Sequence, residues 1–259
     1  MADLKVCLLQ QDLVWEDISA NSLVFDQLIQ SITTQPDIIV LPEMFSTGFS
    51  MNPEKLALGM DQPLITKMKE WAATKNAAVC GSMMIKEKTS FLNRFIWIEP
   101  DGKCLYYDKK HLFRMGEENQ HYTPGSERLL IHFRNWKIAP FICYDLRFPV
   151  WIRRTAIFNY DCLIFVANWP TRRTEHWKLL GRARAIENQA YLVAVNRIGI
   201  DAYQIPYSGD SQVLSPLGEV LFHNNNEACV ETILLKKDVL EQYRKDFPAF
   251  EDADQFEFL

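Results

Sequence analysis

The stretch that decides the fold is WKIAPFICYDLRFP, which covers residues 136–149 of the 259-residue sequence. An apolar run as long as a buried strand ends at Cys143, and we expect a helical segment to follow near residues 147–158. Strands that are covered on both faces show continuous apolar runs of this kind, whereas half-exposed strands alternate. The stretch therefore predicts a buried strand that turns sharply into a helix.

The same unit recurs along the chain, where apolar runs alternate with segments of helical period. The runs are LKVCLL (4–9), DIIVL (37–41), AAVCGSMMI (77–85), DCLIFVA (161–167) and YLVAVN (191–196), and helices are expected near 17–33, 63–75 and 174–188. This order is typical of an α/β fold. No linker rich in Gly, Ser or Pro interrupts it, so a single domain over 1–259 is expected.

Two segments, IWIEPDGKCLYY (96–107) and QVLSPLGEVLFH (212–223), resemble each other as strand, Pro-x-Gly turn, strand. Such segments predict antiparallel hairpins. Their likeness is explained either by two similar halves of the fold or by the chance recurrence of a common turn.

The composition narrows the class of protein. Hydrophobic residues make up 48% of the chain, which is enough for a large core without disulfides or a metal. A net charge of -5 disfavours a nucleic-acid-binding surface, which needs clustered Lys and Arg. The start, MADLKVCLLQQ, has no signal-peptide pattern and no run approaches the length of a membrane span, so we expect a cytoplasmic protein without a membrane partner.

Six cysteines are scattered through the sequence without a C-x-x-C pair, which disfavours a zinc or redox site. Five of them lie in apolar, strand-like surroundings, where a free cysteine behaves as a small hydrophobic residue. Cys143 differs because it ends its strand. No metal and no organic cofactor is expected.

Glu43 and Lys109 also follow predicted strands, in IIVLPEMF and YYDKKHLF. Ligand sites of parallel α/β sheets lie beyond the carboxyl ends of the strands. A carboxylate there can act as a general base, and a lysine can stabilise a developing oxyanion. The alternative is a solvated loop glutamate and a solvated basic turn.

Cys143 lies at a strand-to-helix turn, which presents a nucleophile next to backbone N–H donors. A helix N-terminus and a nearby cation would lower its thiol pKa from about 8.5. The alternative is a buried structural cysteine, and Arg147 is either a surface cation or a partner for a substrate carboxylate. A base and a cation at neighbouring strand ends favour the nucleophile.

The order LPEMF (41–45), DKKHLF (108–113) and CYDLRFP (143–149) resembles the three-part Glu-Lys-Cys signature of the nitrilase superfamily of carbon-nitrogen hydrolases. The similarity continues through VANWP (166–170), residues 182–199 and residues 208–221, and so covers nearly the whole chain. It implies Glu43, Lys109 and Cys143 as catalytic residues, with Glu118 rather than Glu117 as the second glutamate. It also implies a four-layer α-β-β-α sandwich.

Within the superfamily, the CYDLRFP and HLFRM segments resemble the omega-amidase group. This implies hydrolysis of a small amide through a Cys143 thioester, with 2-oxoglutaramate or 2-oxosuccinamate as substrate. Glu43 would move the protons, Lys109 and the Tyr144 backbone N–H would hold the oxyanion, and Glu118 would orient Lys109 or the substrate. Tyr144, Arg147, Trp169 and Arg172 are the expected substrate-binding residues, with Arg147 or Arg172 pairing with a carboxylate.

The resemblance also implies a homodimer, with the acidic and aromatic tail 247–259 contacting the partner. Two rival functions remain at this stage. A nitrilase, carbamoylase or other aliphatic amidase would use the same three residues, and an inactive binding protein would keep only the fold.

Overall fold

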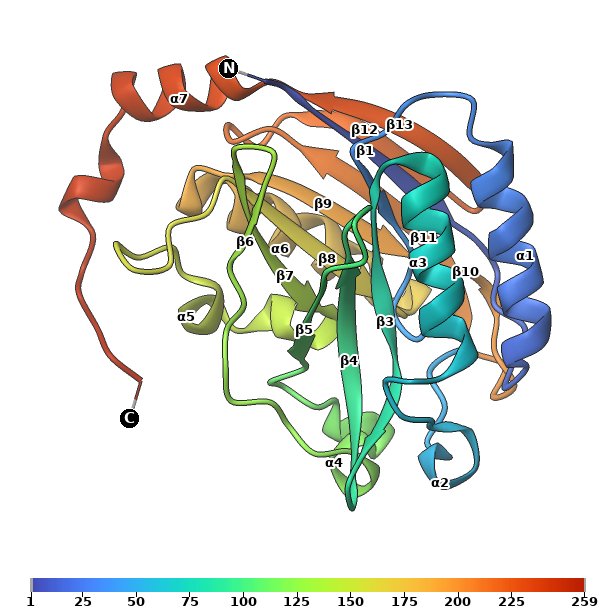
Figure 1. Cartoon of the computed structure of the whole chain (residues 1–259). Helices are drawn as coiled ribbons and strands as arrows, with labels where there is room; N and C mark the ends of the chain where they lie inside the picture. The colour runs from blue at the N-terminus through green and yellow to red at the C-terminus, as the bar shows by residue number, and fades with distance from the viewer. Residues whose placement is uncertain (1, 259) are drawn as a thin grey trace.

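In a computed structural model of the protein, which describes residues 2–258, two mixed β-sheets pack against each other (Figure 1). The first sheet has the order β13 (Cys229–Leu235), β1 (Leu4–Gln10), β2 (Ile38–Val40), β3 (Ala78–Glu87), β4 (Ser90–Ile98), β5 (Cys104–Asp108). The second has the order β10 (Ile198–Ile200), β11 (Pro206–Leu214), β9 (Tyr191–Asn196), β8 (Cys162–Ala167), β7 (Trp136–Ile142), β6 (Ile131–Phe133), and β12 (Val220–Asn225) also pairs with β11.

Helices cover the outer faces of both sheets. The α-helices are α1 (Ile18–Ser31), α2 (Pro53–Leu56), α3 (Pro63–Lys75), α4 (Glu118–His121), α5 (Pro149–Ile152), α6 (Thr174–Asn188) and α7 (Lys237–Asp246). Short 3₁₀ helices are η1 (Arg114–Gly116), η2 (Cys143–Arg147), η3 (Thr171–Arg173) and η4 (Ala249–Asp252). In Figure 1, α1 and α3 lie together on the right of the first sheet, while α6 packs on β9 and β11. The four-layer α-β-β-α sandwich is confirmed.

Strand β1 shows how the sequence produces these layers. Because side chains alternate across a strand, Val6 and Leu8 pack into the core between the two sheets. Cys7 and Leu9 face the other way and pack with residues of α1 and α3. Burial on both faces explains the continuous apolar runs of the sequence.

The two sheets repeat one topology. In the first, β1, β2 and β3 are parallel neighbours, and β4 and β5 continue antiparallel. In the second, β7, β8 and β9 are parallel, and β11 and β12 continue antiparallel. The hairpins β4–β5 and β11–β12 therefore occupy equivalent places, which confirms that their likeness in sequence reflects two similar halves.

The expected helices near 17–33, 63–75 and 174–188 are confirmed as α1, α3 and α6, but the helix expected over 147–158 is wrong. The chain forms η2 and the four-residue α5, and residues 153–161 are irregular. In this segment, side chains form the hydrogen bonds with backbone groups that a helix would otherwise provide. Tyr160 donates its hydroxyl to the Ile152 carbonyl at 2.6 Å, and the Arg154 N–H donates to the Asn188 side chain at 2.9 Å.

The C-terminal tail runs back along its own subunit, in red at the left of Figure 1. Gln189 donates to the Phe247 carbonyl at 2.6 Å, and the Arg154 guanidinium lies 4.2 Å from the centre of the Phe250 ring. Further on, Phe258 packs edge to face on a tryptophan of α5, with ring centres 5.0 Å apart. In residues 2–258 no helix combines the length and the apolar character that crossing a membrane requires.

Candidate active site

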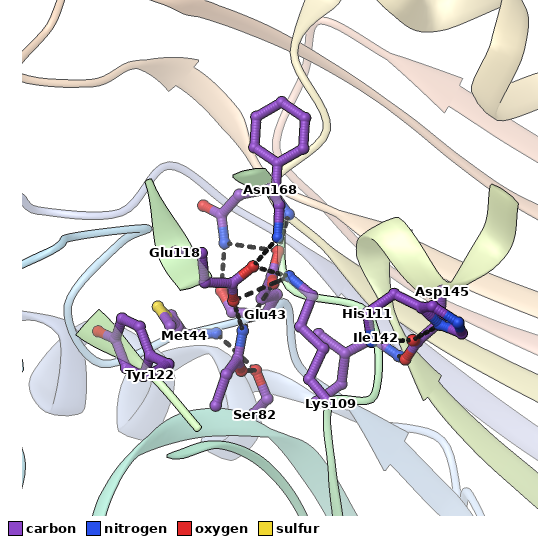
Figure 2. Close-up of polar contacts among 12 residues, drawn as sticks. Glu43, Met44, Ser82, Lys109, His111, Glu118, Tyr122, Ile142, Asp145 and Asn168 are labelled. Atoms are coloured by element: carbon purple, nitrogen blue, oxygen red, sulfur yellow. Dashed lines mark hydrogen bonds and ion pairs between the residues drawn. The ribbon is translucent and has the colours of Figure 1, made fainter. Parts of the chain in front are cut away.

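Three buried charged side chains meet at one edge of the inter-sheet core. The ammonium group of Lys109 lies 2.8 Å from Glu43 Oε1 and 3.0 and 2.9 Å from the two carboxylate oxygens of Glu118 (Figure 2). None of the three side chains has solvent-exposed surface. The structure thus brings together the three residues that follow β2, follow β5 and begin α4.

Glu43 is held by amides from both halves of the fold. Its Oε2 accepts the backbone N–H of Asn168 at 2.7 Å, and its carbonyl oxygen accepts the Asn168 side chain at 2.6 Å. Its Oε1 accepts the Asn93 side chain at 2.9 Å, and Asn93 also donates to Glu118 at 3.0 Å. These fixed donors orient both carboxylates around Lys109.

The charges of this cluster shift one another's ionisation. Burial disfavours the charged form of Lys109, but the carboxylates of Glu118 and Glu43 outweigh it and raise its pKa. Burial raises the pKa of Glu118, and Lys109 offsets part of this effect while the Glu43 charge adds to it. Lys109 is therefore a fixed cation whose charge holds the two carboxylates together.

Cys143 lies at the end of β7 with a φ of +44°, a left-handed conformation that is unusual for a residue other than glycine. Its side chain is buried, and burial and the Glu43 charge raise the pKa of its thiol well above the ordinary value, against the opposing effect of Lys109. The expectation of a lowered thiol pKa is wrong, because burial and two carboxylates outweigh one lysine and a short 3₁₀ turn. These effects favour the neutral form of the thiol at rest.

A cavity of about 320 Å³ opens onto Cys143, at the small end of the range for small-molecule sites. Tyr144, Arg147, Trp169 and Arg172, the four expected substrate-binding residues, all line it. The Arg147 guanidinium lies 4.8 Å from the centre of the Trp169 ring, while Arg172 is exposed.

Comparison with known proteins identifies the family of the chain. The family model for the carbon-nitrogen hydrolases matches residues 5–245. The chain belongs to this family. It is 45% identical to "Omega-amidase YafV" of Yersinia enterocolitica, covering 100% of both chains. It is 30% identical to a 2-oxoglutaramate amidase of Bacillus subtilis, covering 94% of this chain and 95% of that one.

Among solved structures, the chain resembles XC1258 from Xanthomonas campestris, a CN-hydrolase superfamily protein whose crystal structure has an arsenic adduct in the active site. The TM-score is 0.98 and the identity 39%, and each chain is covered completely. The family and the fold that the sequence motifs indicated are thereby confirmed.

Sequence reasoning missed Asn93, Asn168 and Arg173. Asn168 follows β8 directly, so the strand-end rule that selected Glu43 would have selected it too. Asn93 interrupts the apolar strand β4, and a buried polar residue at such a position needs partners. Arg173 lines the cavity half-buried, next to the chosen Arg172.

Arg173 makes no ion pair within the described part of the chain, and its guanidinium lies 5.1 Å from the centre of the Phe113 ring. Burial lowers its pKa, and the neighbouring charges of Arg172 and Arg147 lower it further. A half-buried cation without a counter-ion favours an anionic ligand. Within residues 2–258, no three His, Cys, Asp or Glu side chains gather as ligands of a metal ion would.

Proposed function

We propose that this protein is an omega-amidase, which hydrolyses the terminal amide of 2-oxoglutaramate or 2-oxosuccinamate to a carboxylate and ammonia through a thioester on Cys143. The arrangement of Lys109 between Glu43 and Glu118, beside a thiol that opens into a small cavity, carries the proposal. The names of the relatives give the substrate class. A catalytically inactive binding protein would have no need of this buried charge cluster.

The first step follows from the neutral thiol. Glu43 accepts the Cys143 proton as the sulfur attacks the amide carbon, which produces a tetrahedral oxyanion. Lys109 and the backbone N–H of Tyr144 stabilise that oxyanion. One N–H of Lys109 points to Glu43 and a second is shared between the two oxygens of Glu118, so the third is available to the substrate.

The tetrahedral intermediate collapses when Glu43 returns its proton to the leaving nitrogen and ammonia departs. Water then attacks the thioester, again losing a proton to Glu43, and the proton finally returns to the Cys143 sulfur as the acid is released. Glu118 keeps Lys109 in place throughout. The chemistry needs no metal or organic cofactor.

Arginines at the other side of the cavity recognise the carboxylate of the substrate. Arg173 is the leading candidate of the three, because it is half-buried and has no counter-ion among residues 2–258. Arg147 is already occupied by His176 at 3.1 Å and by the ring of Trp169, and Arg172 is exposed. Arg173→Met should raise KM for a 2-oxo acid amide at least tenfold, whereas Arg172→Met should change it less than threefold.

We also propose a single hydrolase domain that forms a homodimer in the cytoplasm. One family model spans residues 5–245, and six free thiols suit a reducing compartment. Exposed apolar side chains of α5 and α6 (Val150, Leu179 and Ile186) offer a surface for a second copy, to which the tail 247–259 would add. Light scattering of the intact protein and of a variant lacking residues 247–259 tests both points.

Ammonia release tests the activity, measured with 2-oxoglutaramate, 2-oxosuccinamate, glutamine, asparagine, N-carbamoyl amino acids and simple nitriles. We expect the highest kcat/KM with a 2-oxo acid amide and none in Cys143→Ala. Preference for a nitrile or a carbamoyl compound would overturn the substrate but leave the proposed catalytic residues standing.

A further inference from the structure

Asp145 lies completely buried between the segment that carries Lys109 and the segment that carries Cys143. Its Oδ1 accepts the backbone N–H of His111 at 3.0 Å and contacts Nδ1 of the same residue at 2.8 Å. Its Oδ2 accepts the backbone N–H of Ile142 at 3.1 Å and the Tyr107 hydroxyl at 2.8 Å. Figure 2 shows Asp145 joined to His111 and Ile142, to the right of the charge cluster.

These partners flank the two reactive residues. Ile142 directly precedes Cys143, and Tyr107 and His111 stand two residues before and two residues after Lys109. We propose that Asp145 is a positioning residue, which fixes the Lys109 ammonium group relative to the Cys143 sulfur; this rests on the proposed function. Asp145 does not line the cavity, so it acts through the residues it holds.

The local geometry explains why such a clamp is needed. Cys143 keeps a left-handed φ of +44°, which costs free energy unless the surrounding contacts enforce it. The bond from the Ile142 N–H to Asp145 closes the turn at that point. On the other side, Lys109 follows the last residue of β5, and its own backbone N–H still bonds the Asn93 carbonyl of β4 at 3.0 Å, so the contacts to Asp145 fix the chain on either side of this bond.

The clamp extends to α5 through Tyr107. The Tyr107 hydroxyl donates to Asp145 and accepts both the Trp151 indole N–H at 3.0 Å and the Lys110 backbone N–H at 3.2 Å. The segment around Lys109 is therefore bound at Tyr107, Lys110 and His111, and all three contacts lead to the one carboxylate. A carboxylate is required because every partner approaches as a donor.

The test is Asp145→Asn, which keeps the shape but offers one acceptor oxygen and one NH₂ group. The backbone N–H groups of His111 and Ile142 bond to different oxygens of Asp145. In either orientation of the asparagine side chain, one of these N–H groups therefore faces the NH₂ group instead of an acceptor oxygen. Because a displacement of about 1 Å can lower a rate 100-fold, we expect kcat to fall at least 30-fold. KM should change less than threefold, since no contact with substrate is lost.

Asp161→Asn is the matched control. Asp161 is also a buried aspartate, and it accepts the Lys137 backbone N–H and the side chains of Lys237 and Arg244. It precedes β8, about 20 Å from the end of that strand where Asn168 bonds Glu43. We expect Asp161→Asn to lower the melting temperature at least as much as Asp145→Asn, with kcat within twofold of wild type.

A second readout needs no amide substrate. Release of the turn should expose the Cys143 thiol, so Asp145→Asn should speed its alkylation by iodoacetamide at least fivefold, resolved by mass spectrometry from the buried Cys80 and Cys162. Tyr107→Phe should show the same changes, smaller in size. The clamp is overturned if kcat and Cys143 alkylation in Asp145→Asn stay within twofold of wild type, or if Asp161→Asn matches its losses. If wild type hydrolyses no amide, the proposed function fails, and alkylation alone decides the clamp.

Discussion

Replacing Lys109 with methionine tests the charge cluster most directly, because methionine keeps a long side chain and removes the positive charge together with its N–H donors. In the described chain, Lys109 is the only cation within ion-pair distance of Glu43 or Glu118. The Glu43 and Glu118 oxygens that it contacts are at most about 6 Å apart. Without the ammonium group, two buried carboxylates face each other across this gap.

The size of the effect follows from that distance. At an effective dielectric constant of about 20, two unit charges roughly 6 Å apart repel by about 3 kcal/mol. Removing one partner of a buried ion pair commonly costs about 3–5 kcal/mol, so the two figures agree. For a chain of this size, a loss of about 3 kcal/mol lowers the melting temperature by roughly 6–12 °C.

The loss should depend on pH. Without Lys109, burial and the charge of the neighbouring carboxylate act together and raise the pKa of one of the two carboxyls. Because that pKa is higher in the folded than in the unfolded state, stability is present at low pH and is lost as the pH rises through the folded-state pKa. The variant should therefore recover part of the lost stability, relative to wild type, as the pH falls from 8 to 5.

Thermal unfolding at pH 5, 6, 7 and 8, followed by circular dichroism, measures these shifts, and ammonia release measures turnover, which should fall at least about 100-fold. Lys110→Met is the control, since Lys110 is only half-buried and contacts neither carboxylate in the described chain. A Lys109→Met protein as stable as wild type at pH 8 would refute the electrostatic argument. Losses confined to Lys110→Met would show that the wrong lysine had been chosen.

Three further predictions follow from the site. Cys143→Ala and Cys143→Ser should abolish turnover with little change in melting temperature, while Cys80→Ala keeps most of the activity; mass spectrometry of wild type quenched during turnover should find an acyl group on Cys143 alone. Alkylation of Cys143 should be slow at pH 7 and still rise above pH 9, because burial and Glu43 raise the thiol pKa; a plateau near pH 8 would contradict this. Gly125→Ala should lower kcat at least tenfold, because the added Cβ would lie 2.2 Å from the Asp108 carbonyl oxygen and would displace the adjacent Lys109. Gly102→Ala is the control: its added Cβ meets no atom within 4 Å, so only the stability of the protein should fall.

The fold was predictable where a sequence segment has a single physical explanation. Long helices such as α3 begin at a proline and end at a left-handed asparagine, and strands buried on both faces leave continuous apolar runs. The segment after Cys143 misled because its helical period is real for one turn only. The side chains of Tyr160 and Asn188, which come later in the sequence, then form hydrogen bonds with backbone groups that a longer helix would have paired.

The site was predictable to the extent that its residues end strands. Glu43, Lys109 and Cys143 do so, and the structure brings them together. The shift of the thiol pKa could not be predicted from strand ends, because its direction depends on how deeply the sulfur is buried and on two carboxylates contributed by other segments. The choice between Arg172 and Arg173 likewise depends on which of two adjacent side chains turns inward.

The repeated topology explains why the charge cluster forms at this place. Glu43 follows β2 and Asn168 follows β8, and these strands are the central members of the equivalent parallel triplets β1–β2–β3 and β7–β8–β9. Each half therefore contributes one strand end to the same point, where Asn168 binds Glu43 through both its backbone and its side chain. The Glu43 carboxylate belongs to the first half, and Asn168, which binds it, belongs to the second. Cys143 follows β7 of the second half, and Lys109 follows β5 of the first. Since the proposed reactive groups are divided between the halves in this way, neither sheet alone would hold the proposed site, and the packing of one sheet on the other sets the distance between the thiol, the carboxylate and the ammonium group.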